Sequence, residues 1–203
     1  MMSSDSSETR VRILESARKL LESGAGGAVR MSDIARAAGI SRQAVYLHFP
    51  KRADLLIAVT RYLDDVKDVD GRLVKSRSAT SGIERLDAFI EAWGNYIPEI
   101  YGIAKALLAI KDTDEEADLA WNNRMQAVRE GCEAVVRDLA RDGQLTKALT
   151  KKQAVDMLWT MLSVRNWEQL TVECGWSQKQ YIKITRSAAR AMFGIPSEVW
   201  DTP

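Results

Sequence analysis

The sequence predicts an all-α protein of about nine helices. Apolar residues recur every three or four positions along most of the 203-residue chain, and the alternation typical of strands is nearly absent. Capping pairs, in which Ser or Thr precedes Glu or Gln by three positions, begin at Ser81, Thr113, Thr150 and Ser177, and glycines follow periodic segments at Gly24, Gly143, Gly175 and Gly194. These signals place helices at roughly 8–23, 32–38, 42–48, 52–69, 82–97, 99–111, 114–142, 151–174 and 178–193.

The first four helices are expected to form one group. Helix 8–23 and helix 52–69 each carry an apolar stripe at helical spacing. The two helices between them, 32–38 and 42–48, have only about two turns each and are too short to be stable alone. We therefore expect the short helices to pack on the long ones.

The later helices are longer and follow a polar segment, "DGRLVKSRSATS" at 70–81, which is the expected joint between two domains. Pro98 should end or kink the helix before it. The expected organisation is a disordered leader at 1–7, a helix-turn-helix domain at 8–52 continued by a linking helix at 52–69, and a larger helical domain at 70–203.

The formal net charge is only +1, so the whole chain has no strong field that would favour nucleic acid. Residues 1–60 contain nine Lys and Arg against six Asp and Glu, a net +3, which leaves −2 for the remainder. Cys132 and Cys174 lie in apolar helical surroundings and are expected to be reduced core residues of a cytoplasmic protein. The chain shows neither a signal-peptide pattern nor a run of about eighteen apolar residues, so no membrane association is expected.

The segment "MSDIARAAGISRQAVYLHF", residues 31–49, has the form of a helix-turn-helix. Ala35 is small where two helices would cross closely, and Gly39 stands where the turn needs a positive φ. Ser41 is a good N-cap for the next helix. An ordinary helical hairpin is the alternative interpretation of this segment.

The polar residues of this segment and of the next helix start suit duplex DNA. Arg42 can pair with guanine, Gln43 with adenine, and the methyl group of Ala44 can contact the thymine methyl in the major groove. The second set, Tyr46, His48, Lys51 and Arg52, would face the sugar–phosphate backbone. For His48 alone, capping or packing remains the alternative. The full predicted DNA-binding set is Ser32, Ser41, Arg42, Gln43, Ala44, Tyr46, His48, Lys51 and Arg52.

The stretch "MSDIARAAGISRQAVYLHFPKRADLL" resembles the N-terminal region of the TetR (tetracycline-repressor) family. The matching elements are Ile34-Ala35, Ala38-Gly39-Ile40-Ser41, Tyr46-Leu47-His48-Phe49, Arg52 and Leu55-Leu56, over about residues 8–60. The resemblance implies an all-helical homodimer that represses transcription from a palindromic operator and leaves DNA when a small molecule binds its C-terminal domain. It implies base reading by residues 42–44 and backbone contacts by Tyr46 and His48. Arg52 stands where Lys is common, and Lys51 stands where a small capping residue is usual.

The last two helices are the expected dimer interface. Helix 151–174 is apolar nearly all round, and helix 178–193 is amphipathic, so two copies of each could form a four-helix interface. Closure of a monomer core is the alternative. Large apolar side chains suggest a pocket for an apolar or aromatic effector, although core packing explains each of them as well. The pocket set is Phe89, Trp93, Tyr96, Tyr101, Trp121, Met125 and Trp159, with Asn95, Arg124 and Asn166 as polar candidates.

Two other classes of protein compete with a ligand-responsive regulator. A helical enzyme is disfavoured, because the chain has one His and lacks the common metalloprotease, redox, nucleophile-elbow and P-loop motifs. We expect no catalytic residue, metal or cofactor. A DNA-binding architectural protein without an effector is the other alternative.

Overall fold

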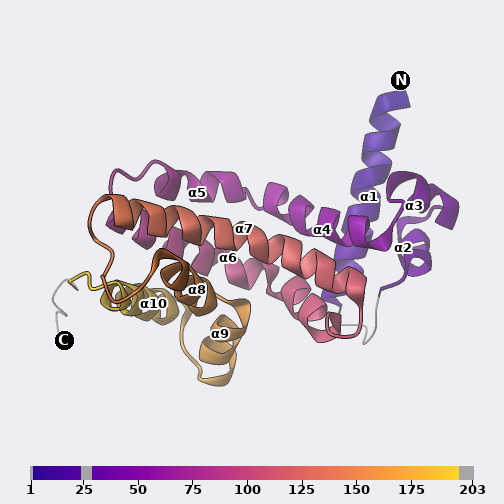
Figure 1. The fold of residues 1–203 in the computed structure, drawn as a ribbon. Coiled ribbons are helices and arrows are strands. Elements are labelled where there is room, and N and C mark those ends of the chain that lie inside the picture. Colours follow the sequence, from indigo (N-terminus) through magenta and orange to yellow (C-terminus); the bar gives the residue numbers. More distant parts are fainter. Residues whose placement is uncertain (1, 24–28, 197–203) are drawn as a thin grey trace. The chain divides into compact units, whose positions relative to one another are not determined.

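A computed structural model describes residues 2–23 and 29–196, and these ranges contain helices and no strand (Figure 1). The all-α fold class is confirmed. The elements are α1 (Met2–Glu22), α2 (Met31–Ala38), α3 (Arg42–His48), α4 (Arg52–Val66), α5 (Val69–Arg77), α6 (Gly82–Ile110), α7 (Glu115–Arg141), α8 (Lys151–Met161), α9 (Val164–Glu168), the π-helical turn η1 (Gln169–Glu173) and α10 (Gln178–Met192).

The described residues divide into two compact units. The N-terminal unit contains the chain up to residue 68 together with residues 100–125, and the C-terminal unit contains residues 69–99 and the chain from 126 onward. The units differ from the predicted domains, because residues 100–125 pack with the first four helices rather than with the later ones. The last three turns of α6 and the first three turns of α7 thus belong to the same compact unit as the helix-turn-helix.

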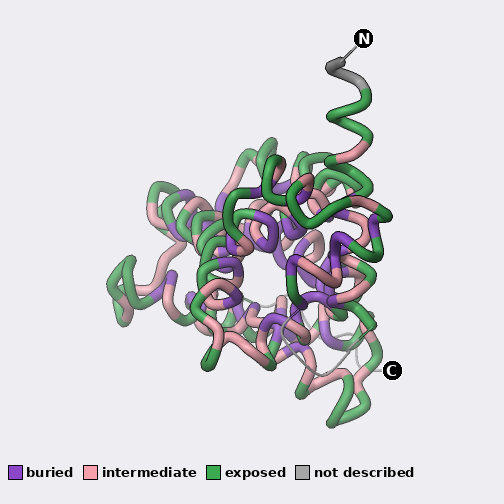
Figure 2. The backbone as a smooth tube through the Cα atoms, turned by 90° about the vertical axis from the view of Figure 1, so that its right-hand side faces the viewer, coloured by how far each residue is buried: buried purple, intermediate pink, exposed green. Residues whose placement is uncertain are grey.

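Each unit has its own apolar core. In the N-terminal unit, Ile13, Ile34 and Val45 are fully buried and join α1, α2 and α3. Residues 5–8 of α1 are exposed, as Figure 2 shows near the N-terminal end of the tube. The structure places residues 2–7 in α1, which corrects the expectation of a disordered leader. No helix in the described ranges is both long and apolar enough to cross a membrane.

Three predicted boundaries after the first four helices are wrong. Pro98 lies inside α6 and does not end it, because buried residues on both sides of it, such as Ile97 and Ile100, keep the helix packed. The expected joint at 70–81 is mostly α5. The predicted helix 151–174 is divided into α8, α9 and η1, because Ser163 starts a new helix by accepting a hydrogen bond from the Asn166 N–H at 3.2 Å.

Most predicted helix ends are confirmed. Helix α3 has the predicted bounds, Thr150 forms a full capping box with Gln153, and Gly143, Gly175 and Gly194 have φ between +69° and +74°. Gly24 lies outside the described residues. Thr113 does not cap α7; the neighbouring Asp114 does, by accepting the N–H groups of Glu116 and Ala117 at 3.2 Å.

Both cysteines are free thiols, but only one is a core residue. Cys132 is buried in α7, and burial raises the pKa of its thiol to about 12. Cys174 is exposed at the end of η1, which corrects the expectation that both are buried. Cys174 follows the end of η1, so it does not lie on the apolar face of the continuous helix 151–174 that the sequence predicted.

Candidate nucleic-acid interface

The turn between α2 and α3 holds α3 in a fixed position. Gly39 has φ +66°, and the N–H of Ile40 donates to the Ala35 carbonyl at 3.0 Å. The Ser41 hydroxyl accepts the Ala44 N–H at 3.1 Å and so caps α3. Val45 and Phe49 bury the inner side of the helix. These contacts are those that the sequence predicted for a helix-turn-helix.

The outward side of α3 consists of large exposed side chains. Gln43 and Leu47 are four positions apart and each is two positions from the buried Val45, so helix geometry places them on the side opposite the core. Leu47 is 81% exposed. Ala44 and His48, also four positions apart, are half-buried on one flank of this outward ridge.

The other flank of α3 borders a basic cleft. The Arg42 guanidinium lies 5.4 Å from the centre of the Tyr46 ring, and its Nη2 donates to the Tyr46 hydroxyl at 3.3 Å. The cleft has a volume of about 570 Å³, and the residues that line it are Arg30, Met31, Ser32, Arg42, Tyr46, Pro50, Lys51, Arg52 and Glu116. Cations from three segments, namely Arg30 before α2, Arg42 in α3 and Lys51 before α4, thus face one hollow, a charge arrangement that suits phosphate.

Most of the Arg52 guanidinium is already paired within the protein. Its side chain is only 12% exposed, and its Nη1 binds both carboxylate oxygens of Asp114 at 2.8 and 2.9 Å. The same nitrogen lies 3.3 Å from Glu116, and Nε donates to the Val29 carbonyl at 2.7 Å. The guanidinium thus joins α4 to the start of α7, while its buried Nη2 has no hydrogen-bond partner and Arg52 still lines the basic cleft. Contact of Arg52 with a DNA phosphate stays a prediction.

The N-terminus of α4 is likewise already occupied. Lys51 stands at the N-cap position of α4, and its side chain makes no capping hydrogen bond. The Glu116 carboxylate accepts the Ala53 N–H at 3.1 Å instead. The first turn of α4 therefore has fewer free N–H groups for binding a phosphate than the sequence indicated. Lys51 itself stays exposed at the edge of the cleft.

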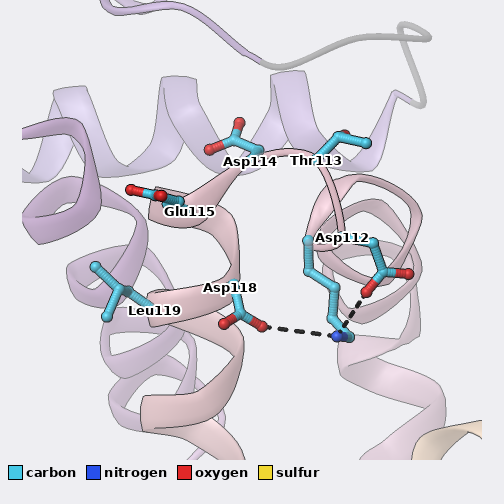
Figure 3. Close-up of a pocket in the computed structure, with 7 residues that line it drawn as sticks. Asp112, Thr113, Asp114, Glu115, Asp118 and Leu119 are labelled. Carbon is cyan, nitrogen blue, oxygen red and sulfur yellow. Dashed lines mark hydrogen bonds and ion pairs between the residues drawn. The ribbon is translucent and has the colours of Figure 1, made fainter.

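The turn between α6 and α7 supplies the carboxylates (Figure 3). It borders a second cleft of about 490 Å³, in which Lys111 binds Asp112 at 2.8 Å and Asp118 at 3.6 Å. Asp114 and Asp118 point in different directions in Figure 3, and Asp114 both caps α7 and pairs with Arg52. Within the described ranges, no group of His, Cys, Asp and Glu has a metal-binding arrangement.

The residues predicted to bind an effector do not fall in one unit. Phe89, Trp93, Tyr96 and Trp159 belong to the C-terminal unit, and Tyr101, Trp121 and Met125 belong to the N-terminal unit. Trp93 is buried and donates its ring N–H to the Leu162 carbonyl at 2.7 Å, and its ring lies 6.0 Å from that of Tyr96. Phe89 packs so closely on Gly131 that a Cβ there would lie 2.4 Å from its ring. Core packing thus accounts for these three aromatic residues.

The polar candidates for the effector also have partners within the protein. Asn95 donates to the Glu91 carbonyl at 2.9 Å, Asn166 donates to the Thr160 carbonyl at 2.6 Å, and Arg124 pairs with Asp64 at 3.3 Å. Each contact explains its side chain without a ligand.

Sequence reasoning missed several residues of the interface. Leu47 could have been found from the helical spacing, because it lies opposite Val45. Arg30 precedes the expected helix and carried no motif. Asp114 and Glu116 are more than sixty residues from Arg52 in sequence, and no local pattern predicts their pairing.

Comparisons with known proteins agree with this geometry. Residues 13–59 match the family model described as bacterial regulatory proteins, tetR family. The chain is 22% identical over 184 residues to the transcriptional regulator UidR of Escherichia coli K12, covering 87% of this chain and 91% of UidR. It is 27% identical to the transcriptional activator FasR of Mycolicibacterium smegmatis, with 89% and 87% covered. These relatives are regulators rather than enzymes.

A solved structure with the same fold is that of a TetR transcription regulator from Haloarcula marismortui. The TM-score is 0.66 at 18% identity, and the match covers 93% of this chain and 97% of the other. The family match thus runs from α1 through α2, the turn and α3 into α4, while the likeness in fold extends over nearly the whole chain. Residues 13–59 thus match the N-terminal region of the tetR family of bacterial regulatory proteins, and the chain as a whole is similar in fold to solved TetR regulators.

Proposed function

We propose that the protein is a dimeric repressor that binds a palindromic operator through α3 and leaves it when a small apolar or aromatic effector binds the C-terminal unit. The observation that carries the DNA-binding part is the outward side of α3, where exposed Gln43 and Leu47 lie beside a cleft lined by four cationic side chains. A major groove accepts such a helix, and the phosphates beside the groove meet the cations.

The roles along the interface follow from position. Ser32, Arg42, Tyr46 and Lys51 line the basic cleft and face the sugar–phosphate backbone in this proposal. Glu116 also borders the cleft, but Arg52 lies 3.3 Å from its carboxylate and offsets its charge. The half-buried His48 approaches the backbone on the opposite flank of α3. Because phosphate contacts release counterions, binding should weaken steeply with salt.

Dimerisation is proposed through the segments 151–174 and 178–193. Helix α8 leaves Met157 50% exposed, and η1 leaves Val172 59% exposed. A second copy of the chain would cover such apolar side chains. A two-fold dimer would place its two copies of α3 in successive major grooves and so bind two half-sites about one helical turn of DNA apart.

Repression and release by an effector rest on the resemblance to the family. The C-terminal unit contains the buried aromatic side chains Phe89, Trp93 and Tyr96 and the half-buried Trp159, which an apolar molecule could contact if the core opened. A ligand that binds only the folded protein raises the thermal midpoint by mass action. A metabolite that raises the midpoint and dissociates the protein from DNA supports this part, whereas stability shifts without DNA release count against it.

The central experiment is selection of bound duplexes from random DNA with the purified full chain. We expect a palindromic consensus whose half-sites lie about 10 base pairs apart, and affinity that falls by orders of magnitude from about 50 to 200 mM salt. The matched control pair is Arg42→Ala, inside the basic cleft, and Arg36→Ala, an exposed arginine of α2 outside it.

We expect Arg42→Ala to weaken binding strongly and Arg36→Ala to leave it nearly unchanged. Equal loss in both variants would show that only general charge matters. A chain that enriches no duplex at low salt would contradict the proposed function.

A further inference from the structure

Leu47 is the most exposed of the large apolar side chains in the described ranges, at 81%. It lies in the last turn of α3, a helix that is held in place by its cap at Ser41 and by the buried Val45. Nothing in the fold requires an apolar residue at this position, because no core lies on that side of α3. An exposed leucine next to a cationic cleft points to a partner that is both charged and locally apolar.

Arg42 does not share this outward ridge. Its guanidinium is drawn toward Tyr46, with an Nη2 to hydroxyl distance of 3.3 Å, and both side chains line the basic cleft together with Lys51. The residues that remain on the side directly opposite Val45 are Gln43 and Leu47, one helical turn apart. In a groove, this ridge would penetrate furthest, and Arg42 would remain near the wall.

The chemistry of the major groove limits what Leu47 can contact. Every base edge there presents hydrogen-bonding atoms, and the only apolar group is the C5 methyl of thymine. Placing leucine on a guanine or cytosine edge would remove water from polar atoms without replacing their hydrogen bonds. When leucine covers a thymine methyl group, in contrast, two apolar groups leave water and no hydrogen bond is lost.

We propose that Leu47 determines specificity by packing on the methyl group of a thymine, beside an adenine read by Gln43, while Arg42 binds a backbone phosphate together with Tyr46. This proposal rests on the proposed function and names the base class that the same interface selects. It replaces Arg42 as the predicted guanine reader, and it moves the thymine contact from the half-buried Ala44 to the exposed Leu47.

The test uses the selected operator with single thymines replaced by deoxyuridine, which removes only the methyl group. For the wild-type chain, affinity should fall about fourfold per half-site at one position beneath α3, the effect of one methyl group returned to water. Leu47→Ala should lose a similar factor on the thymine operator and lose nothing further on the uracil operator. Ala44→Gly, the matched control, should keep the full sensitivity to uracil.

Because Leu47 is exposed, Leu47→Ala should fold, and its thermal midpoint provides the check. Uracil sensitivity that persists in Leu47→Ala, or that disappears in Ala44→Gly, overturns the assignment to Leu47. A consensus without thymine beneath α3 overturns it as well. These results all require DNA binding, so they differ from failure of the proposed function, in which no duplex is bound at all.

The role of Arg42 has its own readout in the same selection. Arg42→Ala should reduce affinity for all sequences alike and reduce the salt dependence by about one phosphate contact, with an unchanged consensus. A consensus that loses a guanine at one position would identify Arg42 as a base reader and contradict this part of the proposal.

Discussion

Helices α3 and α6 place their large side chains in opposite environments. In α3, Leu47 and Tyr46 are exposed around a single buried residue, Val45, whereas in α6 Trp93 and Tyr96 are almost completely buried. The aromatic residues of α6 are explained by the core in which they pack. The exposed residues of α3 have no such explanation within the fold, so they carry the information about a partner.

The largest effect expected from this contrast is on stability. Trp93→Ala should lower the free energy of unfolding by about 3–5 kcal/mol, because it leaves a cavity in the core and removes the hydrogen bond to Leu162. Urea unfolding measures this change. Leu47→Ala is the comparison and should stay within about 0.5 kcal/mol of wild type. A similar loss of unfolding free energy in both variants would mean that Leu47 contributes to packing and is not free for a partner.

The adjacent pair Lys51 and Arg52 sharpens the same contrast within two residues. Arg52→Met should cost about 2 kcal/mol of stability, because it leaves Asp114 and Glu116 without their cation. Lys51→Met should leave the unfolding free energy unchanged and weaken DNA binding, with a salt slope lower by about one. Unfolding and salt-dependent DNA titration of both variants separate the two roles. The reverse assignment of effects would contradict the inward position of Arg52.

A smaller effect is expected when the pH is lowered, through an ion pair in the C-terminal unit. The hydrogen bond from Arg85 lowers the pKa of Asp138 below its ordinary value of 3.8, against the opposing effect of burial. A lowered pKa in the folded state means that the pair stabilises the fold above pH 3.8 and that this contribution is lost as the pH falls through the lower, folded value.

Asp138→Asn should therefore reduce stability by about 1 kcal/mol near neutral pH and flatten the loss of stability at acid pH. Urea unfolding at a series of pH values measures the slope, with the exposed Asp70→Asn as control. An unchanged slope for Asp138→Asn would show that other carboxylates determine the acid transition.

Local signals explain why α3 was predicted better than the rest of the chain. The cap at Ser41 and the left-handed Gly39 lie within a few residues of the helix that they define. The break after α8 also has a local signal, the cap at Ser163, but the apolar character of the surrounding sequence concealed it. At Pro98 the local signal predicted a helix end where the structure has none. Packing of the residues on both sides of the proline outweighs the one missing hydrogen bond.

The ion pairs between distant segments were beyond sequence reasoning. Arg52 was predicted from its position in a motif, and the motif contains no information on Asp114 or Glu116. The effector set had the same weakness, because helical spacing identifies large apolar residues but does not distinguish a filled core from a pocket.

The bond of Arg52 to Asp114 and Glu116 has a practical consequence for protein engineering. An excised headpiece that stops near residue 68 would lack the acidic counterpart of this arginine and the helical segments that carry it. Chimeric regulators made by grafting the first four helices onto a foreign sensor would inherit the same defect. A transferable DNA reader from this chain should include residues 100–125 as well.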